Sequence, residues 1–203
     1  MNLTIYILLP VHNRRAVTER FIDCLAVQSC QNYHLILIDD GSVDETAGMV
    51  KAKIGQLTVL KGEGSWWWAG SLQQGINWLH ANRVNATDIV IFANDDITFE
   101  PDFLLKAVKM LGGLSRTLIL PQVLNDETGL AEESGVEANL QKFTFKTATS
   151  SASINCLTTR GLILRMDDLD AIGNFHPRLL PHYWSDYEFT IRAYRKGLGL
   201  FTS

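Results

Sequence analysis

The residues best suited to chemistry are Asn94, Asp95 and Asp96, which directly follow an apolar run, IVIF, at positions 89–92. Two adjacent carboxylates repel each other unless a cation lies between or beside them. Carboxylate and amide oxygens are the ligands that Mg²⁺ and Mn²⁺ prefer. We therefore expect a divalent-cation site with few protein ligands, because a bound diphosphate would supply the others. The alternative is a solvated loop in which an Asp caps the helix that follows.

A second acidic segment is IDDGS, at positions 38–42. Asp39 or Asp40 is suited to accept hydrogen bonds from a ribose or from an N–H group of a base. The alternative is that these acids cap the next helix while Gly41 makes the turn, and the residues leave both interpretations open. The sequence contains neither GxGxxG nor GxxxxGK[ST], so a phosphate group would be bound through a metal ion rather than a glycine loop.

The run GEGSWWWAG, at positions 62–70, contains three successive tryptophans. Neighbouring side chains on a strand or helix diverge, so the three rings cannot all face one core. We expect at least one of them to line a cleft or the surface, where its flat apolar face suits a sugar ring or a base. The alternative is that Trp67 and Trp68 pack into the core while Trp66 covers a loop.

The segment YWSDYEFTIR, at positions 183–192, places Asp186, Phe189 and Arg192 three residues apart. That spacing brings side chains near one another on a helix. Asp186 would lie in the first turn, where the helix dipole favours an acid. It is therefore either a structural acid of the helix or a general base.

The elements that must position these residues alternate through the first half of the chain. Strands are predicted at 3–11, 33–42, 56–62 and 88–95, and helices at 15–29, from a cap at Ser42 or Asp44 to about Lys53, at 68–82, and at 101–111 after Pro101. This alternation predicts an α/β fold with a mostly parallel sheet and right-handed crossovers. Such sheets bind ligands at the carboxyl ends of their strands, where PVHN, DDGS and NDD all fall.

The second half of the chain has a different pattern. Short β-prone runs between 117 and 165 indicate a mixed region with antiparallel character. A final helix is predicted at 184–196, with Gly197 at its C-terminal end. The closing LGLFTS is typical of the start of another strand, and we expect the chain to be truncated there.

Size and composition limit the class of protein. The 203 residues suit one α/β domain or slightly more, and a net charge of -4 argues against a nucleic-acid partner. Three cysteines without a metal-like spacing indicate reduced thiols in packing roles and a cytoplasmic protein. No apolar run approaches the roughly 20 residues of a membrane span, and no signal peptide is visible. Any membrane contact, at the inner face, would be peripheral or come from sequence absent here.

Taken together, these segments resemble glycosyltransferase family 2, whose members have the GT-A fold. The resemblance rests on PVHNR at 10–14, LILIDDGSVDET at 35–46, NDDI followed by PD within 94–102, RGLILR at 160–165 and SDYEFTIR at 185–192. WWWAGSLQQGI also resembles a segment of rhamnosyltransferase-like branches. The resemblance implies a nucleotide-sugar-binding half at 1–112 and a smaller, mixed acceptor-side half that carries the catalytic base at 113–203.

The resemblance also implies roles for the residues of the first half. Pro10 and Val11 would border the nucleotide base, with Asp40 bonding to it. Asp95 would contact ribose or help to shape the metal site. Asp96, in the position of the last acid of the family's DxD motif, would bind Mg²⁺ or Mn²⁺.

In the second half, Arg160 and Gly161 would lie beside the donor sugar, and Asp186 would match the catalytic aspartate of the family's ED motif. The other residues expected to contact substrate are Trp67, Trp68, Asn94 and Trp184. Two positions depart from the family pattern, because Asn94 replaces the first Asp of DxD and Ser185 replaces the Glu of ED.

The implied activity is inverting transfer of a sugar from a UDP- or dTDP-sugar to a glycan or lipid-linked acceptor. One alternative is a sugar nucleotidylyltransferase, which would need a Gly-rich segment where this chain has LPVHNRR. The other is a catalytically inactive module that binds nucleotide or glycan. This alternative is supported by the two departures from the family pattern, Asn94 and Ser185, and by the expected truncation. The sequence predicts no particular oligomeric state.

Overall fold

The computed structural model describes residues 3–125, 128–129, 131 and 135–203. The predicted alternation of strands and helices in the first half is confirmed. Its strands are β1 (Ile5–Val11), β2 (Tyr33–Asp39), β3 (Leu57–Lys61) and β4 (Ile89–Phe92), and its helices are α1 (Arg15–Ala26), α2 (Thr46–Lys53), α3 (Trp67–Ala81) and α4 (Phe103–Leu111).

The second half is mixed, as predicted, and ends in the expected helix and strand. It contains β5 (Thr117–Leu120), β6 (Val136–Asn139), β7 (Thr144–Thr147), a 3₁₀ turn (Ser151–Ser153), β8 (Leu162–Arg165), α5 (Met166–Ile172), α6 (Ser185–Arg195) and β9 (Gly199–Thr202). Gly197 follows α6 with a φ of 80°, which suits a glycine after the last helical turn. Helix α5 was not predicted, although Asp167 and Asp168 in its first turn are a helix-start signal.

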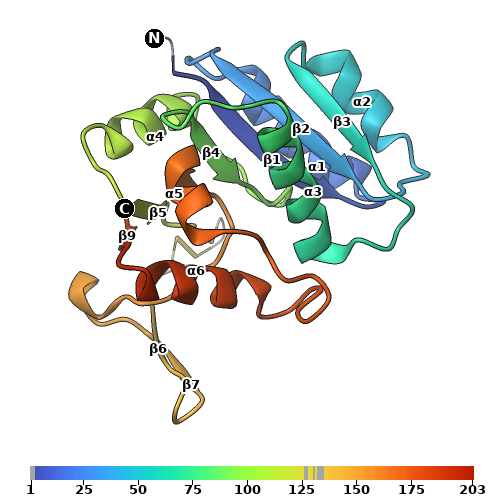
Figure 1. Ribbon diagram of the computed structural model, residues 1–203. Helices are drawn as coiled ribbons and strands as arrows, with labels where there is room; N and C mark the ends of the chain where they lie inside the picture. The colour runs from blue at the N-terminus through green and yellow to red at the C-terminus, as the bar shows by residue number, and fades with distance from the viewer. Residues whose placement is uncertain (1–2, 126–127, 130, 132–134) are drawn as a thin grey trace.

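Within the described residues, the main sheet has seven strands in the order β3-β2-β1-β4-β8-β5-β9. Strand β1 pairs in parallel with both β2 and β4, so the chain reverses its direction of travel across the sheet at β1. Strand β8 runs antiparallel to its neighbours β4 and β5. The separate β6–β7 hairpin extends away from this sheet below α6 in Figure 1.

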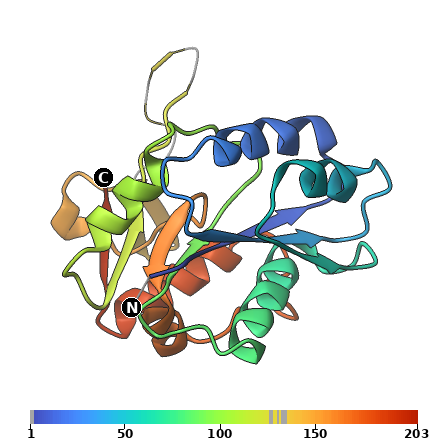
Figure 2. The ribbon, with the colours of Figure 1, turned by 90° about the horizontal axis from the view of Figure 1, so that it is seen from above.

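Helices cover both faces of the main sheet. Figure 2 shows α1 and α2 on one side and α3 on the other, and the core divides in the same way. Successive residues of β1 alternate between the two layers: Ile7 and Leu9 pack with α1, α2 and α4, whereas Leu8 packs with α3, α5 and α6. This burial on both faces explains why the strands are nearly continuously apolar. None of the described helices has the length and apolar character that a membrane span needs.

This topology brings three polar loops to one edge of the sheet. The loops after β1, β2 and β4 meet there because their strands are parallel neighbours. The antiparallel direction of β8 brings the residues before it to the same edge, and the backbone N–H of Gly161 donates to the carbonyl of Phe92 at 2.9 Å. The edge next to β1 is the switch point at which open α/β sheets bind ligands.

The predicted cap of α2 by Ser42 is wrong. The Ser42 hydroxyl accepts a hydrogen bond from the backbone of Asn13 at 2.9 Å, which ties the loops after β1 and β2 together. Asp44 accepts from the N–H of Thr46 at 3.2 Å and from the N–H of Arg15 at 2.9 Å. The one carboxylate therefore stabilises the first turns of both α1 and α2.

A glycine in α3 allows that helix to pack closely on the sheet. A Cβ at Gly75 would lie 2.5 Å from Leu8 Cδ2 and 2.9 Å from Ile38 Cδ1, both in the core. We expect Gly75→Ala to lower the free energy of unfolding in urea by about 1–3 kcal/mol through overpacking. The better helix propensity of alanine offsets at most about 1 kcal/mol of this.

The matched control is Gly55→Ala, where a Cβ meets nothing within 4 Å. Its free energy of unfolding should change by no more than about 0.5 kcal/mol. If Gly75→Ala proved as stable as this control, the close contact between α3 and the sheet would not be a constraint on the fold.

Candidate active site

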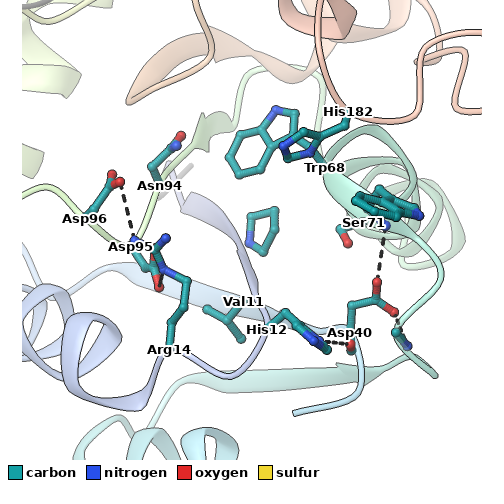
Figure 3. A pocket seen from close by; sticks show the side chains of 13 residues that line it. Val11, His12, Arg14, Asp40, Trp68, Ser71, Asn94, Asp95, Asp96 and His182 are labelled. Carbon is teal, nitrogen blue, oxygen red and sulfur yellow. Dashed lines mark hydrogen bonds and ion pairs between the residues drawn. The ribbon is translucent and has the colours of Figure 1, made fainter.

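A cavity of about 350 Å³ opens at the edge where the three loops meet. Figure 3 shows Asp40 and the pair Asp95–Asp96 on opposite sides of it, with Trp68 and His182 along a further wall. Its lining comes from the ends of β1, β2 and β4, the start of α3 and the loop before α6: Pro10, Val11, His12, Arg14, Asp40, Gly64, Trp67, Trp68, Ser71, Asn94, Asp95, Asp96 and His182.

The first carboxylate of the pair, Asp95, is buried and held by two donors. The Thr18 hydroxyl donates to it at 2.9 Å, and Nε of Arg14 donates at 3.0 Å. Burial raises the pKa of Asp95, while the Thr18 hydrogen bond and the Arg14 charge act in the opposite direction. The carboxylate thus fixes α1 and the loop after β1 against the end of β4.

The second carboxylate, Asp96, faces solvent and the cavity, with 39% of its side chain exposed. Nη2 of Arg14 lies 3.4 Å and Nη2 of Arg160 lies 3.2 Å from its oxygens. The cationic partners that two adjacent carboxylates require are therefore arginines in this structure. Arg14 had no predicted role, although it is the last residue of the PVHNR segment.

Asn94 supplies a further oxygen at the same place. Its Oδ1 atom is buried and makes no hydrogen bond with any described residue. An amide oxygen of this kind beside the Asp96 carboxylate fits the oxygen ligands that Mg²⁺ and Mn²⁺ prefer. Within the described part of the chain, no three His, Cys, Asp or Glu side chains form a metal-binding group. A cation here would have few protein ligands, as the sequence predicts.

On the opposite side of the cavity, the Asp40 carboxylate accepts hydrogen bonds from the protein backbone. Its Oδ1 accepts from the N–H groups of Gly64 and Ser65 at 2.8 and 3.2 Å. Its Oδ2 accepts from those of Trp66 and Trp67 at 2.8 and 3.2 Å. Four donors match the four acceptor positions of a carboxylate. The expected contact between Asp40 and a base therefore stays a prediction, and it would have to share these oxygens.

Two glycines make room for this arrangement. Gly41 has a φ of 81°, and a Cβ there would lie 2.8 Å from the backbone nitrogen of Gly64. A Cβ at Gly62 would lie beside the Asp40 carboxylate and Trp66. The loop after β2 and the loop before α3 are thus packed backbone against backbone.

The three tryptophans diverge, as predicted. Trp66 is partly buried against the core, Trp67 is 60% exposed, and Trp68 donates from Nε1 to the Thr159 hydroxyl at 3.3 Å. Trp67 and Trp68 both line the cavity, which confirms that at least one ring faces a cleft. The alternative, in which Trp67 packs into the core, is wrong.

A second cavity of about 370 Å³ adjoins the first and contains Asp186. The two cavities share Trp68, Asn94, Asp96 and His182, and the second adds Thr158, Thr159, Arg160, Tyr183, Trp184 and Asp186. Helix α6 is anchored beside it because the Thr190 hydroxyl donates to the Leu157 carbonyl at 2.7 Å and accepts from its N–H at 3.0 Å. Asp96 and Asp186, 90 residues apart in sequence, therefore face one space.

The other residues of the 183–192 segment have structural positions. Phe189 is fully buried, and Arg192 Nε donates to Glu188 at 2.8 Å, so neither lines the cavity with Asp186. Ser185 is buried, and its hydroxyl donates to the carbonyl of His182 at 2.8 Å. The side chain in the position of the family's Glu is thus neutral and turned into the loop.

The first turn of α3 contacts the loop before α6. The N–H of Ala69 donates to the Pro181 carbonyl at 2.9 Å, and the rings of Trp67 and His182 meet edge to face at 5.8 Å. His182 lines both cavities and was not predicted from the sequence, where nothing distinguishes it from other loop histidines. Gly161 lies outside both, in a groove that adjoins Arg160 on the α1 side.

Comparison with curated proteins identifies distant relatives. Over 109 residues the chain is 25% identical to a PGL/p-HBAD biosynthesis glycosyltransferase of Mycobacterium tuberculosis, which covers 52% of this chain and 41% of the relative. The Mycobacterium bovis protein of the same name matches equally well. The matched segment therefore spans less than half the length of these relatives.

Solved structures share the fold over almost the whole chain. Staphylococcus aureus TarS 1-349 in complex with UDP-GlcNAc has a TM-score of 0.73 at 18% identity, covering 99% of this chain and 56% of that one. Mannosyltransferase PcManGT of Pyrobaculum calidifontis, in complex with GDP-Man and Mn²⁺, has a TM-score of 0.70 at 14% identity, covering 100% and 55%. GalNAc-T7 with UDP, GalNAc and Mn²⁺ has a TM-score of 0.75 at 13% identity, covering 98% and 41%.

These likenesses support the GT-A fold that the sheet order and the site at its edge indicate. The family model described as "Glycosyl transferase family 2" matches residues 6–173, which is most of the chain. This chain therefore belongs to glycosyl transferase family 2.

Proposed function

We propose that this chain transfers a sugar from a nucleotide-diphosphate donor to a hydroxyl group of a glycan or lipid-linked acceptor, with inversion at the anomeric carbon. The observation that carries the proposal is that Asp96 and Asp186 line one cavity. The reaction needs positive charge where the diphosphate leaves and a base where the acceptor attacks. The arginines and oxygen ligands around Asp96 suit the first, and the Asp186 carboxylate suits the second.

The nucleotide is proposed to lie in the first cavity. Pro10, Val11 and Trp67, which line this cavity together with Asp40, would border the base. Asp95 was expected either to contact ribose or to help shape the metal site. Its burial and its bonds to Thr18 and Arg14 favour the second role. The donor half would be residues 1–112, and the acceptor half residues 113–203.

Charge on the diphosphate would be met by residues from three loops. The Asp96 carboxylate and Asn94 Oδ1 would hold a Mn²⁺ or Mg²⁺ ion, and Arg14 and Arg160 add two guanidinium groups at the same place. When bound, the ion would supply several kcal/mol of charge stabilisation at the transition state. PcManGT in complex with GDP-Man and GalNAc-T7 with UDP both contain Mn²⁺, which supports this proposal.

The acceptor is proposed to enter the second cavity. Asp186, in the first turn of α6, would take the proton from its hydroxyl group as that oxygen attacks the sugar opposite the leaving diphosphate. A positioned base typically contributes about 10²–10⁴-fold in rate. Arg160 would lie beside the donor sugar, between the diphosphate and the acceptor. A uridine or deoxythymidine donor and a rhamnosyltransferase-like specificity stay predictions from the sequence.

Two substitutions separate binding from chemistry. We expect Asp96→Ala to abolish both transfer and the metal-dependent binding of nucleotide sugar, because the variant lacks the principal metal ligand. We expect Asp186→Asn to retain donor binding but to lower the rate by about 10²–10⁴-fold. A thermal-shift panel of UDP-, dTDP- and GDP-sugars with and without Mn²⁺ measures binding, since a ligand at 100 times its Kd adds about 2.7 kcal/mol of stability.

Release of free sugar from the bound donor measures turnover without a known acceptor. Normal turnover by Asp186→Asn with an identified acceptor would exclude Asp186 as the base. If the unmodified chain bound nucleotide sugars with Mn²⁺ but neither transferred nor hydrolysed them, the inactive binding module would be the better interpretation. If Mn²⁺ and Mg²⁺ made no difference to the binding of any nucleotide, the metal proposal would be wrong.

The hydrogen bonds from the backbone of residues 64–67 to the Asp40 carboxylate lead to a further prediction. Asp40→Asn replaces one acceptor oxygen with an NH₂ group that would face backbone N–H groups, and hydrogen bonds to a charged group contribute about 1.5–3 kcal/mol each. We expect the loop 64–67 to loosen and nucleotide affinity to fall about tenfold or more, equivalent to about 1.4 kcal/mol or more. Titration of the nucleotide that the thermal-shift panel identifies would measure this change.

The control is the neighbouring substitution Asp39→Asn. Asp39 Oδ1 accepts from the N–H of Ser42 at 2.8 Å, and a carboxamide oxygen can keep this bond. Nucleotide affinity should therefore change little. Equal affinities for Asp40→Asn and Asp39→Asn would show that the loop 64–67 does not depend on the Asp40 charge.

A further inference from the structure

An aromatic cluster lies beside the second cavity, and Trp184 is its only member with an expected contact to substrate. The cluster consists of Phe143 and Phe145 from the β6–β7 hairpin and Trp184 and Tyr187 from the start of α6. Ring centroids are 4.8 Å apart for Phe145 and Trp184, 5.7 Å for Phe143 and Trp184, and 5.4 Å for Phe145 and Tyr187. The hairpin projects from the body of the molecule close to α6 in Figure 1.

Much of this cluster faces solvent. Phe143 is 71% exposed and Trp184 is 46% exposed, and the adjacent Tyr183 is exposed as well. Single exposed apolar residues are common, but a contiguous exposed aromatic patch marks a surface that binds something. Packing of the fold therefore does not account for these rings.

The backbone points to the same conclusion. Phe143 and Trp184 have φ angles of 50° and 68°, in the left-handed region that bulky side chains rarely adopt. Glycine or asparagine would relax both positions. Large exposed aromatic residues in an unfavourable backbone conformation reduce stability, and such strain is concentrated at functional sites. Among the residues that the structure describes, the other exposed aromatic residue in this region of φ is Trp67, which lines the first cavity.

Trp184 joins the cluster to the reaction site. It contacts Phe143 and Phe145 on one side and lines the second cavity together with Asp186 on the other. A molecule lying on the cluster would therefore reach the proposed base. Trp184 lines the second cavity and is not among the residues that line the first, where the nucleotide is proposed to lie.

We propose that the aromatic cluster is the binding platform for a sugar ring of a glycan acceptor. The inference rests on the proposed function and specifies its acceptor as a carbohydrate. Flat aromatic faces match the apolar C–H face of a sugar ring, and the polar groups of the cavity (Thr158, Tyr183 and Asp186) match its hydroxyls.

The hairpin favours a sugar over a lipid surface as the occupant. Its exposed strand positions on β7 are polar, namely Thr144, Lys146 and Thr147. A hairpin that enters a bilayer would carry apolar residues at these positions. Binding to vesicles is therefore an outcome that counts against the proposal.

The test uses Phe143→Asn, which removes an aromatic ring from the cluster and relaxes the backbone. Titrations with the methyl glycosides of rhamnose, galactose and glucose, followed by saturation-transfer NMR and tryptophan fluorescence, measure sugar binding. We expect the unmodified chain to bind at least one of them, and Phe143→Asn to bind it at least tenfold more weakly. The melting temperature of the variant should be equal or higher, which excludes misfolding as the cause. Phe145→Leu should weaken binding in the same way without relaxing the backbone.

The matched control is Arg83→Asn, an exposed residue at the end of α3 with a φ of 52°. It should relax the backbone equally and leave sugar binding unchanged. Failure of the unmodified chain to bind any of the glycosides, or undiminished binding by both cluster variants, would overturn the proposal. So would binding to phosphatidylglycerol–phosphatidylethanolamine vesicles that Phe143→Asn abolishes.

The same samples keep this proposal separate from the proposed function. Thermal shifts with UDP- and dTDP-sugars and Mn²⁺ report the donor site, which the cluster variants should leave unchanged. If the unmodified chain showed the thermal shift with nucleotide sugar but bound none of the glycosides, the platform proposal alone would be overturned. Sugar binding that depends on Phe143 without any nucleotide shift would support the platform and overturn the transferase proposal.

Discussion

The site depends on the attraction between two arginines and the carboxylate pair at the end of β4. Burying a charge costs free energy unless it is paired and hydrogen-bonded, and Asp95 is buried at the mouth of the central strands. Arg14 bonds Asp95 and Asp96 together, and Arg160 approaches Asp96 from the other side. These ion pairs connect the loop after β1, the end of β4 and the segment before β8.

The direction of one strand makes this possible. If β8 ran parallel to β4, Arg160 would lie at the opposite edge of the sheet, because β8 spans only Leu162–Arg165 and the residue before it marks its starting edge. Its antiparallel pairing also sets the position of residues 157–159, to which Thr190 anchors α6. The position of Asp186 on the same cavity as Asp96 thus follows from sheet topology, which is stabilised mainly by the buried apolar layers.

Local patterns in the sequence were enough to predict the first half of the fold. Its strands are covered on both faces, so they can be recognised in the sequence as continuous apolar runs. The polar residues that follow these runs lie at the edge of the sheet where the first cavity opens. Helix α5 was missed because MDDLDAI is short and directly follows β8, so no loop separates the two. Three features could not be predicted because they depend on contacts between segments distant in sequence, which periodicity does not encode. They are the hydrogen bonds between Asp40 and the loop before α3, the ion pairs of Arg14, and the position of His182 at the cavities. A carboxylate after a buried strand has the same local signal whether it binds a ligand or four backbone N–H groups.

The wall shared by the two cavities has a thermodynamic consequence. Trp68, Asn94, Asp96 and His182 border both spaces. The contact between Ala69 and Pro181 joins the start of α3, which carries Trp68, to the loop that carries His182. Any molecule that shifts these side chains in one compartment alters the affinity of the other. By linkage this coupling is reciprocal. If a molecule in one cavity changes the affinity of the other cavity for its ligand by some factor, that ligand changes the affinity for the first molecule by the same factor. Two molecules held in the two cavities at the same time would therefore influence each other's binding through this shared wall.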